Sequence, residues 1–119
     1  MTNYELKNKL QAIADTRGIS IEKEVALEAL DNYPEELEVC FSNILNYGCI
    51  TGIVGSLIYY TDTHAFFDTH YDQIEELRCE YEENTGMPIN IKGDLKNDLA
   101  WFAFEHVAYT MANELGLEI

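Results

Sequence analysis

The first apolar pattern along the chain has the spacing of an amphipathic helix over residues 3–16. Its apolar positions are Leu6, Leu10, Ile13 and Ala14. They recur at steps of three and four residues, which places them on one face of an α-helix. Thr2 and Glu5 form a capping box at the start, because each side chain can bond the backbone N–H of the other. We therefore expect a first helix that ends near Gly18.

Two more helices are predicted between Ser20 and Gly48. Ser20 can cap the second helix, whose apolar side carries Ile21 and Val25 while its glutamates point outward. Pro34 suits the first turn of the third helix, since its fixed φ and missing N–H cost nothing there. The third helix has its apolar positions at Leu37, Cys40, Phe41, Ile44 and Leu45.

Residues 49–60 are apolar on all sides, which is typical of a buried element. Gly48, Gly52 and Gly55 would share one face of a helix and allow a neighbour to pack closely. The Ile-Val and Ile-Tyr-Tyr sequences also have β propensity, so a strand is the alternative to the helix that we favour. The segment is shorter than the roughly 20 residues that span a bilayer, so we expect no membrane contact.

Residues 63–84 predict the longest helix, capped by Asp62 or Thr61. Its apolar stripe is Phe67, Tyr71, Ile74, Leu77 and Tyr81. The sequence Asn-Thr-Gly-Met-Pro over residues 84–88 is a clear stop signal for this helix. Residues 89–92 follow as an extended piece with room for one short strand.

The last helix opens at Gly93-Asp94. Trp101, Phe104 and Tyr109 add aromatic bulk beyond a single apolar stripe, so we expect this helix to lie against several others. The whole pattern predicts one mainly α domain over residues 1–119, a compact bundle of about five to six helices. That length is close to the commonest domain size.

Composition and motifs exclude several protein classes. A hydrophobic content of 47% supports a core and excludes a disordered acidic tail. The polar N-terminus does not resemble a signal peptide, so we expect a cytoplasmic protein. Cys40, Cys49 and Cys79 lack CxxC spacing, and each is expected to be a buried thiol. The sequence has no nucleophile elbow, P-loop or dinucleotide-binding motif, so we expect neither an enzyme nor a bound cofactor.

The charge of the chain is extreme and unevenly distributed. Twenty-two acidic residues oppose seven lysines and arginines, for a net charge of −15. No basic residue lies between Lys23 and Arg78, and none follows Lys96. Most acids therefore lack an i,i+4 partner and repel one another. Such a surface is unsuited to nucleic acid itself, but it suits a basic protein surface that evolved to hold nucleic acid.

The acids of the 63–84 helix recur at steps of three, four and seven residues. We name them the acidic row: Asp68, Asp72, Glu75, Glu76, Glu80, Glu82 and Glu83. A four-residue step advances about 6 Å along a helix axis, comparable with the spacing of phosphates along a DNA strand. The row can therefore mimic nucleic acid, with Tyr60 and Phe66 beside it as candidate aromatic anchors. A solvated helix face explains the same residues.

A second acidic zone lies on the two preceding helices. Its members are Glu22, Glu24, Glu28, Asp31, Glu35, Glu36 and Glu38. A different chemistry is suggested by His64, Asp68 and Asp72, which share a helix face at i, i+4 and i+8. Imidazole and carboxylate at this spacing can bind Zn²⁺ or Mn²⁺, with Glu105 or His106 as a further ligand. The alternative is that His64 caps the helix start or packs against aromatic rings.

Two stretches carry a resemblance to known sequences. They are GCITGIVGSLIYYTDTHAFFDTHYDQIEELRCEYEENTG and the later IKGDLKNDLAWFAFEHVAY. They resemble a small family of uncharacterised acidic proteins carried by phages and mobile elements of Gram-positive bacteria. The resemblance covers about residues 45–117, and the N-terminal third looks more individual. No activity is established for that family, so no functional residue is transferred.

The resemblance implies a context, because small acidic phage proteins often inhibit host defence. We therefore expect an anti-CRISPR or antirestriction protein that binds a Cas effector or a restriction enzyme through its acidic surface. One alternative is an interaction module unrelated to nucleic acid, for which a homodimer through the aromatic face is one form. The other is a metal-binding protein or metal-dependent enzyme centred on His64, Asp68 and Asp72.

Overall fold

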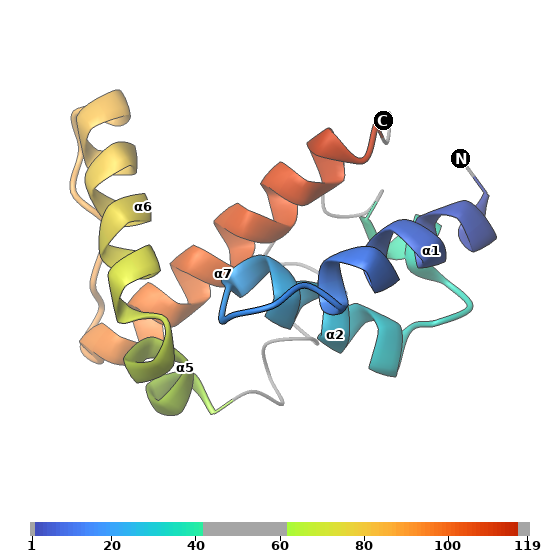
Figure 1. Ribbon diagram of the computed structural model, residues 1–119. Helices are drawn as coiled ribbons and strands as arrows, with labels where there is room; N and C mark the ends of the chain where they lie inside the picture. The colour runs from blue at the N-terminus through green and yellow to red at the C-terminus, as the bar shows by residue number, and fades with distance from the viewer. Residues whose placement is uncertain (1, 42–61, 117–119) are drawn as a thin grey trace.

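A computed structural model describes residues 2–41 and 62–116. These residues form five helices, and residues 37–41 are helical as well (Figure 1). The helices are α1 (Asn3–Ala14), α2 (Ile21–Asn32), α5 (Thr63–Thr69), α6 (Tyr71–Thr85) and α7 (Leu95–Glu114). The prediction of a mainly α bundle with about five to six helices is confirmed. No strand occurs in the described residues, so residues 89–92 do not form the short strand for which the sequence has room. Residues 49–60, predicted as helix or strand, lie outside them.

Four of the helices, α1, α2, α5 and α7, begin where the sequence predicts because their caps are local. Four helices have a side-chain oxygen that accepts a hydrogen bond from a backbone N–H three residues ahead. These capping residues are Thr2, Ser20, Asp62 and Asp94. Gly86 ends α6 with φ of 68°, a left-handed conformation that favours glycine.

The third predicted helix has a cap that comes from far away in the sequence. Its helical residues begin at Leu37 rather than at Pro34. The Asn3 side chain accepts hydrogen bonds from the backbone N–H of Leu37 at 2.9 Å and of Glu38 at 3.4 Å. The same side chain donates to the Pro34 carbonyl at 3.0 Å. Asn3 therefore joins the start of α1 to the start of this helical segment.

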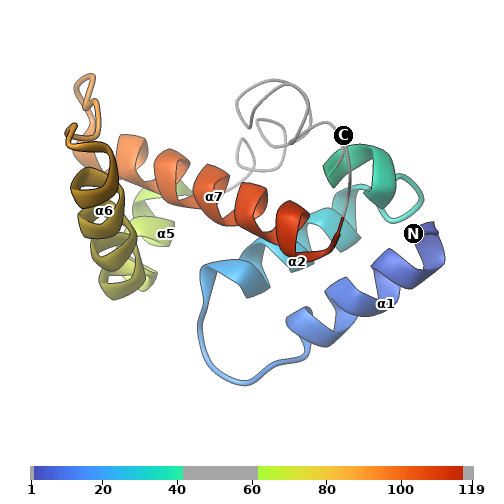
Figure 2. The same cartoon turned by 90° about the horizontal axis from the view of Figure 1, so that it is seen from above.

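The α7 helix forms the centre of the fold. It contacts α2, α5 and α6, while α1 packs on α2 (Figures 1 and 2). Four of its buried residues are alanines, which let neighbouring helices approach closely, and Phe104 is completely buried among them. The expectation that the last helix lies against several others is confirmed. No helix in residues 2–41 and 62–116 has both the length and the apolar content that crossing a bilayer would require.

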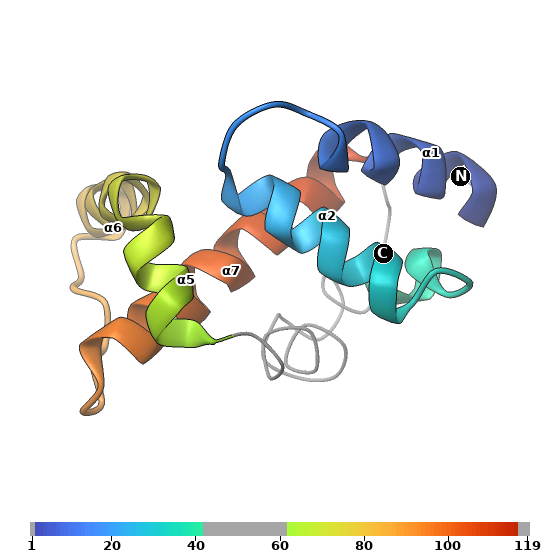
Figure 3. The same cartoon turned by 60° about the horizontal axis from the view of Figure 1, so that its bottom comes forward.

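Residues 63–84 are not one continuous helix, which corrects the prediction. The α5 helix ends at Thr69 and α6 begins at Tyr71, with His70 between them at φ −109° and ψ 23°. His70 is buried against the ring of Phe66, at a centroid distance of 4.7 Å. The bend places α5 along α7 and turns α6 in another direction (Figure 3). Because His70 and Phe66 are buried, the chain bends at His70. The two helices therefore do not share the single straight axis that the helical spacing assumed.

Candidate protein-binding surface on α6

Four carboxylates of the acidic row lie together on the solvent side of α6. We call Asp72, Glu76, Glu80 and Glu83 the acidic face, and all four are exposed. At about 100° per residue, they fall within roughly 80° of one another around the helix. The opposite side of α6 packs on the rest of the protein through Ile74, which is completely buried. The amphipathic pattern of the helix therefore directs these four acids away from the core.

Two other members of the row are held by the arginine of α6. The Arg78 guanidinium lies 3.1 Å from Glu82 and 3.7 Å from Glu75. Glu82 also accepts the backbone N–H of Ile89 at 3.3 Å. The hydrogen bond from Arg78, with that from Ile89, lowers the pKa of the Glu82 carboxyl. Glu82 thus ties α6 to the segment that follows it, and Arg78 neutralises the edge of α6 rather than the acidic face.

The remaining predicted contact residues do not belong to the acidic face. Asp68 belongs to α5, where its carboxylate is 2.9 Å from the ammonium group of Lys96. Phe66 is only 5% exposed and packs against Phe104, so it is a core residue and its prediction as an anchor is wrong. Tyr60 lies outside the described residues. The acidic row of seven is therefore reduced to four exposed acids with Glu75 at their edge.

The structure does not bring His64, Asp68 and Asp72 together as a metal site. His64 Nε2 lies 2.7 Å from Asp94 Oδ2, and this hydrogen bond is the largest cause of the lowered pKa of the Asp94 carboxyl. Asp68 pairs with Lys96. The bend at His70 puts His64 on α5 and Asp72 on α6, so these two residues no longer share one helix face. Within residues 2–41 and 62–116, no three His, Cys, Asp or Glu side chains are grouped to hold a metal ion.

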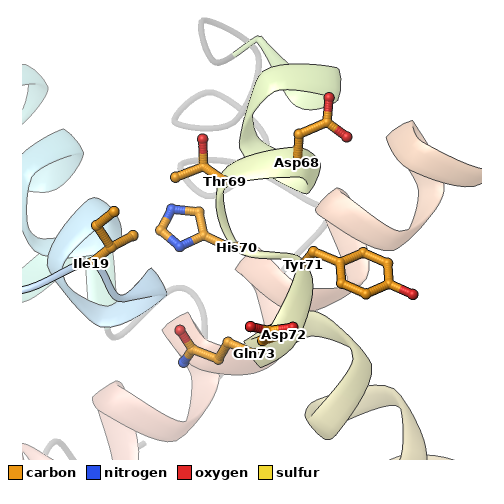
Figure 4. A pocket seen from close by; sticks show the side chains of 7 residues that line it. All are labelled: Ile19, Asp68, Thr69, His70, Tyr71, Asp72 and Gln73. Atoms are coloured by element: carbon orange, nitrogen blue, oxygen red, sulfur yellow. The ribbon is translucent and has the colours of Figure 1, made fainter.

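The bend itself has a hollow of about 320 Å³ on its outer surface. Figure 4 shows His70 pointing from the bend toward Ile19, while Tyr71 points the opposite way. Tyr71 was expected in the apolar stripe, but it is 51% exposed because the chain turns there. The hollow has buried His70 at its side, so it belongs to the joint between α5 and α6 rather than to a separate ligand site.

Part of the second acidic zone is used inside the protein. The Gln73 side chain donates to the Glu22 carboxylate at 2.9 and 3.1 Å, and His70 Nε2 lies 3.8 Å from Glu24. Burial lowers the pKa of the His70 imidazole, and the nearby Glu24 opposes that effect. The roles of Gln73 and His70 are not visible in the sequence, because their partners lie about fifty residues away and leave no local signal.

The cysteines divide into two environments. Cys40 is completely buried, and burial, with Glu36 nearby, raises the pKa of its thiol to about 12. Cys79 is exposed, which corrects the prediction that all three thiols are buried. On α6 it falls about 20° from Asp72 around the helix, at the acidic face. Cys49 lies outside the described residues.

A groove that the sequence did not predict lies beside the C-terminal end of α6. It has a volume of about 570 Å³ and lies between α6, the following segment and α7. We call it the α6 groove and define it by Tyr81, Met87, Ile89, Phe102, His106 and Tyr109. Of the aromatic residues that the sequence placed beyond a single apolar stripe of the last helix, Tyr109 lines this groove. Glu105 and His106, considered above as metal ligands, line this groove instead.

The fold and this surface define an acidic, mainly α-helical domain with a face of exposed carboxylates. Residues 4–117 match a family described as a domain of unknown function (DUF7222), and the chain belongs to that family. The matched range includes the N-terminal third of the chain. Comparisons with curated proteins and with solved structures gave no match.

Proposed function

We propose that this protein inhibits a nucleic-acid-handling protein by docking its acidic face onto the basic surface that normally holds DNA or guide RNA. The observation that supports this most is the grouping of Asp72, Glu76, Glu80 and Glu83 on one exposed side of α6. The single basic residue of that helix, Arg78, contacts Glu75 and Glu82 and leaves the acidic face uncompensated.

The spacing of these acids allows them to act as one charged surface. A four-residue step advances about 6 Å along the helix. The Debye length at physiological ionic strength is about 8 Å, so the fields of successive carboxylates overlap before salt screens them. A basic groove would be attracted to this face over a distance, and the association would be fast and would weaken with salt.

The resemblance to proteins of phages and mobile elements supports a particular setting for this activity. In that setting the partner is a Cas effector or a restriction enzyme of the bacterial host, and the chain is an anti-CRISPR or antirestriction protein acting in the host cytoplasm. The α6 groove supports the second candidate, an interaction module unrelated to nucleic acid. Association through that groove alone would be insensitive to salt, which separates the two candidates.

The test reverses the charge of Asp72, Glu76 and Glu83 to lysine. Purified wild-type protein is added to DNA cleavage assays with a panel of Cas effectors and restriction enzymes. We expect inhibition of at least one enzyme by the wild type and its loss in the triple variant. The matched control changes Asp31, Glu35 and Glu38 to lysine, because these acids are also exposed and the change in net charge is the same.

The three ways in which this test can fail have different meanings. A triple variant that is folded by circular dichroism and still inhibits would show that the acidic face is not the docking surface. Absence of inhibition across both enzyme classes would refute the anti-defence function itself. Equal loss in the control variant would mean that net charge, rather than the α6 surface, governs binding.

A further inference from the structure

The α6 groove has an apolar rim that the core of the protein does not use. Met87 is 66% exposed, Tyr109 42% and Tyr81 37%, although all three are large and apolar or aromatic. They stand around one hollow, on α6, on α7 and on the segment between them. Contiguous exposed apolar groups of this kind mark interaction sites more often than scattered ones do.

The floor and one wall of the groove are already in place. The Tyr81 ring packs edge-on against Phe102 at 5.3 Å, and Phe102 stacks on His106 at 5.8 Å. The segment after α6 is held by the bond from the Ile89 N–H to Glu82 and by a 3.2 Å bond from the Met87 N–H to Thr85. An incoming side chain would therefore meet a groove that needs little ordering.

The charge around the groove selects among its possible occupants. Its lining includes Glu105 but no lysine or arginine, and Glu83 and Glu80 of the acidic face belong to the last turns of the adjoining helix. A second copy of this chain would bring another net charge of −15 to the same place. Like charges across an interface oppose association, whereas a basic segment would be complementary.

We propose that the α6 groove receives one large apolar side chain from a basic segment of the partner, whose lysines and arginines contact the acidic face. This inference rests on the proposed function and deepens it by naming the chemistry of the docking segment. The apolar side chain supplies a component of binding that salt does not screen, and the basic residues supply the attraction and the orientation.

The test uses two synthetic peptides of equal charge. One has a tryptophan between two lysine pairs, and the other has an alanine in place of the tryptophan. Each is titrated into the ¹⁵N-labelled full chain while amide shifts are recorded by NMR. Both should shift amides of Asp72 to Glu83, and the tryptophan peptide should also shift those of Ile89, Phe102 and Tyr109. We expect the tryptophan peptide to bind about tenfold more tightly, from the apolar area it buries.

Substitutions at the rim test the site without disturbing the core. Met87→Gln combined with Tyr109→Gln should abolish the advantage of tryptophan and leave the alanine peptide unaffected. Neither side chain belongs to the buried core, so the fold should be retained. Tyr4→Gln is the matched control, because Tyr4 is 74% exposed on α1 and α1 lies away from α6 (Figure 1). A tryptophan advantage that survives the rim substitutions would overturn the proposal.

The other outcomes separate the groove from the acidic face. Equal binding of both peptides, with shifts confined to α6, would refute the groove and leave the proposed function standing. No shifts with either peptide at millimolar concentration would contradict both. Groove shifts that appear on raising the protein concentration without peptide would identify a second copy of the chain as the occupant, and would overturn the proposal.

Discussion

The Gln73 side chain on α6 accepts a hydrogen bond from the backbone N–H of Ile21, the first residue of α2, at 2.9 Å. That N–H is one of the four at a helix start that have no partner within the helix. The same amide group donates to Glu22 in the first turn of α2. Gln73 therefore fixes the base of α6 to the start of a helix 52 residues earlier.

Replacement of Gln73 by alanine should lower the free energy of unfolding by about 1 kcal/mol, because it leaves the Ile21 N–H without its acceptor in a partly buried place. Urea unfolding followed by circular dichroism measures the change. Gln11→Ala is the control, since the Gln11 side chain on α1 makes an exposed hydrogen bond to Asp15, the residue that caps the end of α1. Equal losses in the two variants would show that the long-range bond contributes nothing specific.

Asn3→Ala should destabilise the protein by about 1 kcal/mol, the usual cost of losing a capping side chain. The reason is that Asn3 accepts from the N–H groups of Leu37 and Glu38 and also holds the Pro34 carbonyl. Thermal or urea unfolding gives the value. Asn8→Ala, at an exposed position of the same helix, should change stability little, and a similar effect there would remove the capping argument.

Stability should fall on acidification through the protonation of His70. Burial lowers the pKa of the folded imidazole below the ordinary value of about 6.5, so the unfolded state takes up the proton first. The stability contributed by neutral His70 is fully present above the pKa of the unfolded state, and it is lost as the pH falls through the lower pKa of the folded state. In His70→Gln, the urea midpoint of unfolding should no longer change with pH across this window. The control His64→Gln should keep the dependence on pH in this window, and its absence there would assign the effect to another group.

The acidic face should repel anions from Cys79 before any partner is involved. In a Cys49→Ser background, neutral iodoacetamide should alkylate Cys79 severalfold faster than anionic iodoacetate, beyond their ratio with free cysteine. Mass spectrometry should find Cys40 unmodified, because it is buried with its pKa raised to about 12. Salt at 1 M, where the Debye length is about 3 Å, should remove the difference. Asp72→Lys with Glu76→Lys leaves two lysines beside two glutamates on the face and should remove most of the difference, and an unchanged ratio would show that the face has no effective field.

The residues near helix ends illustrate what local sequence determined. Thr2, Ser20, Asp62 and Asp94 were all predictable caps, because each bonds an N–H only three residues ahead. Gly86 was a predictable end for the same reason, since a left-handed residue stops a helix whatever it packs against. The net charge and its concentration in base-poor stretches were likewise properties of the sequence itself.

Tertiary structure decided which of the acids form a surface. Helical spacing placed Asp68 in one row with Asp72, but burial of His70 bent the chain between them and Lys96, 28 residues away, paired with Asp68. Phe66 was predicted from the sequence as an aromatic anchor, but it is buried against Phe104 of α7. A pattern along one helix specifies faces but not neighbours, because burial and ion pairing depend on residues that only the folded chain brings together. The sequence thus determined an acidic helical protein, and packing chose the four carboxylates and the groove that it presents.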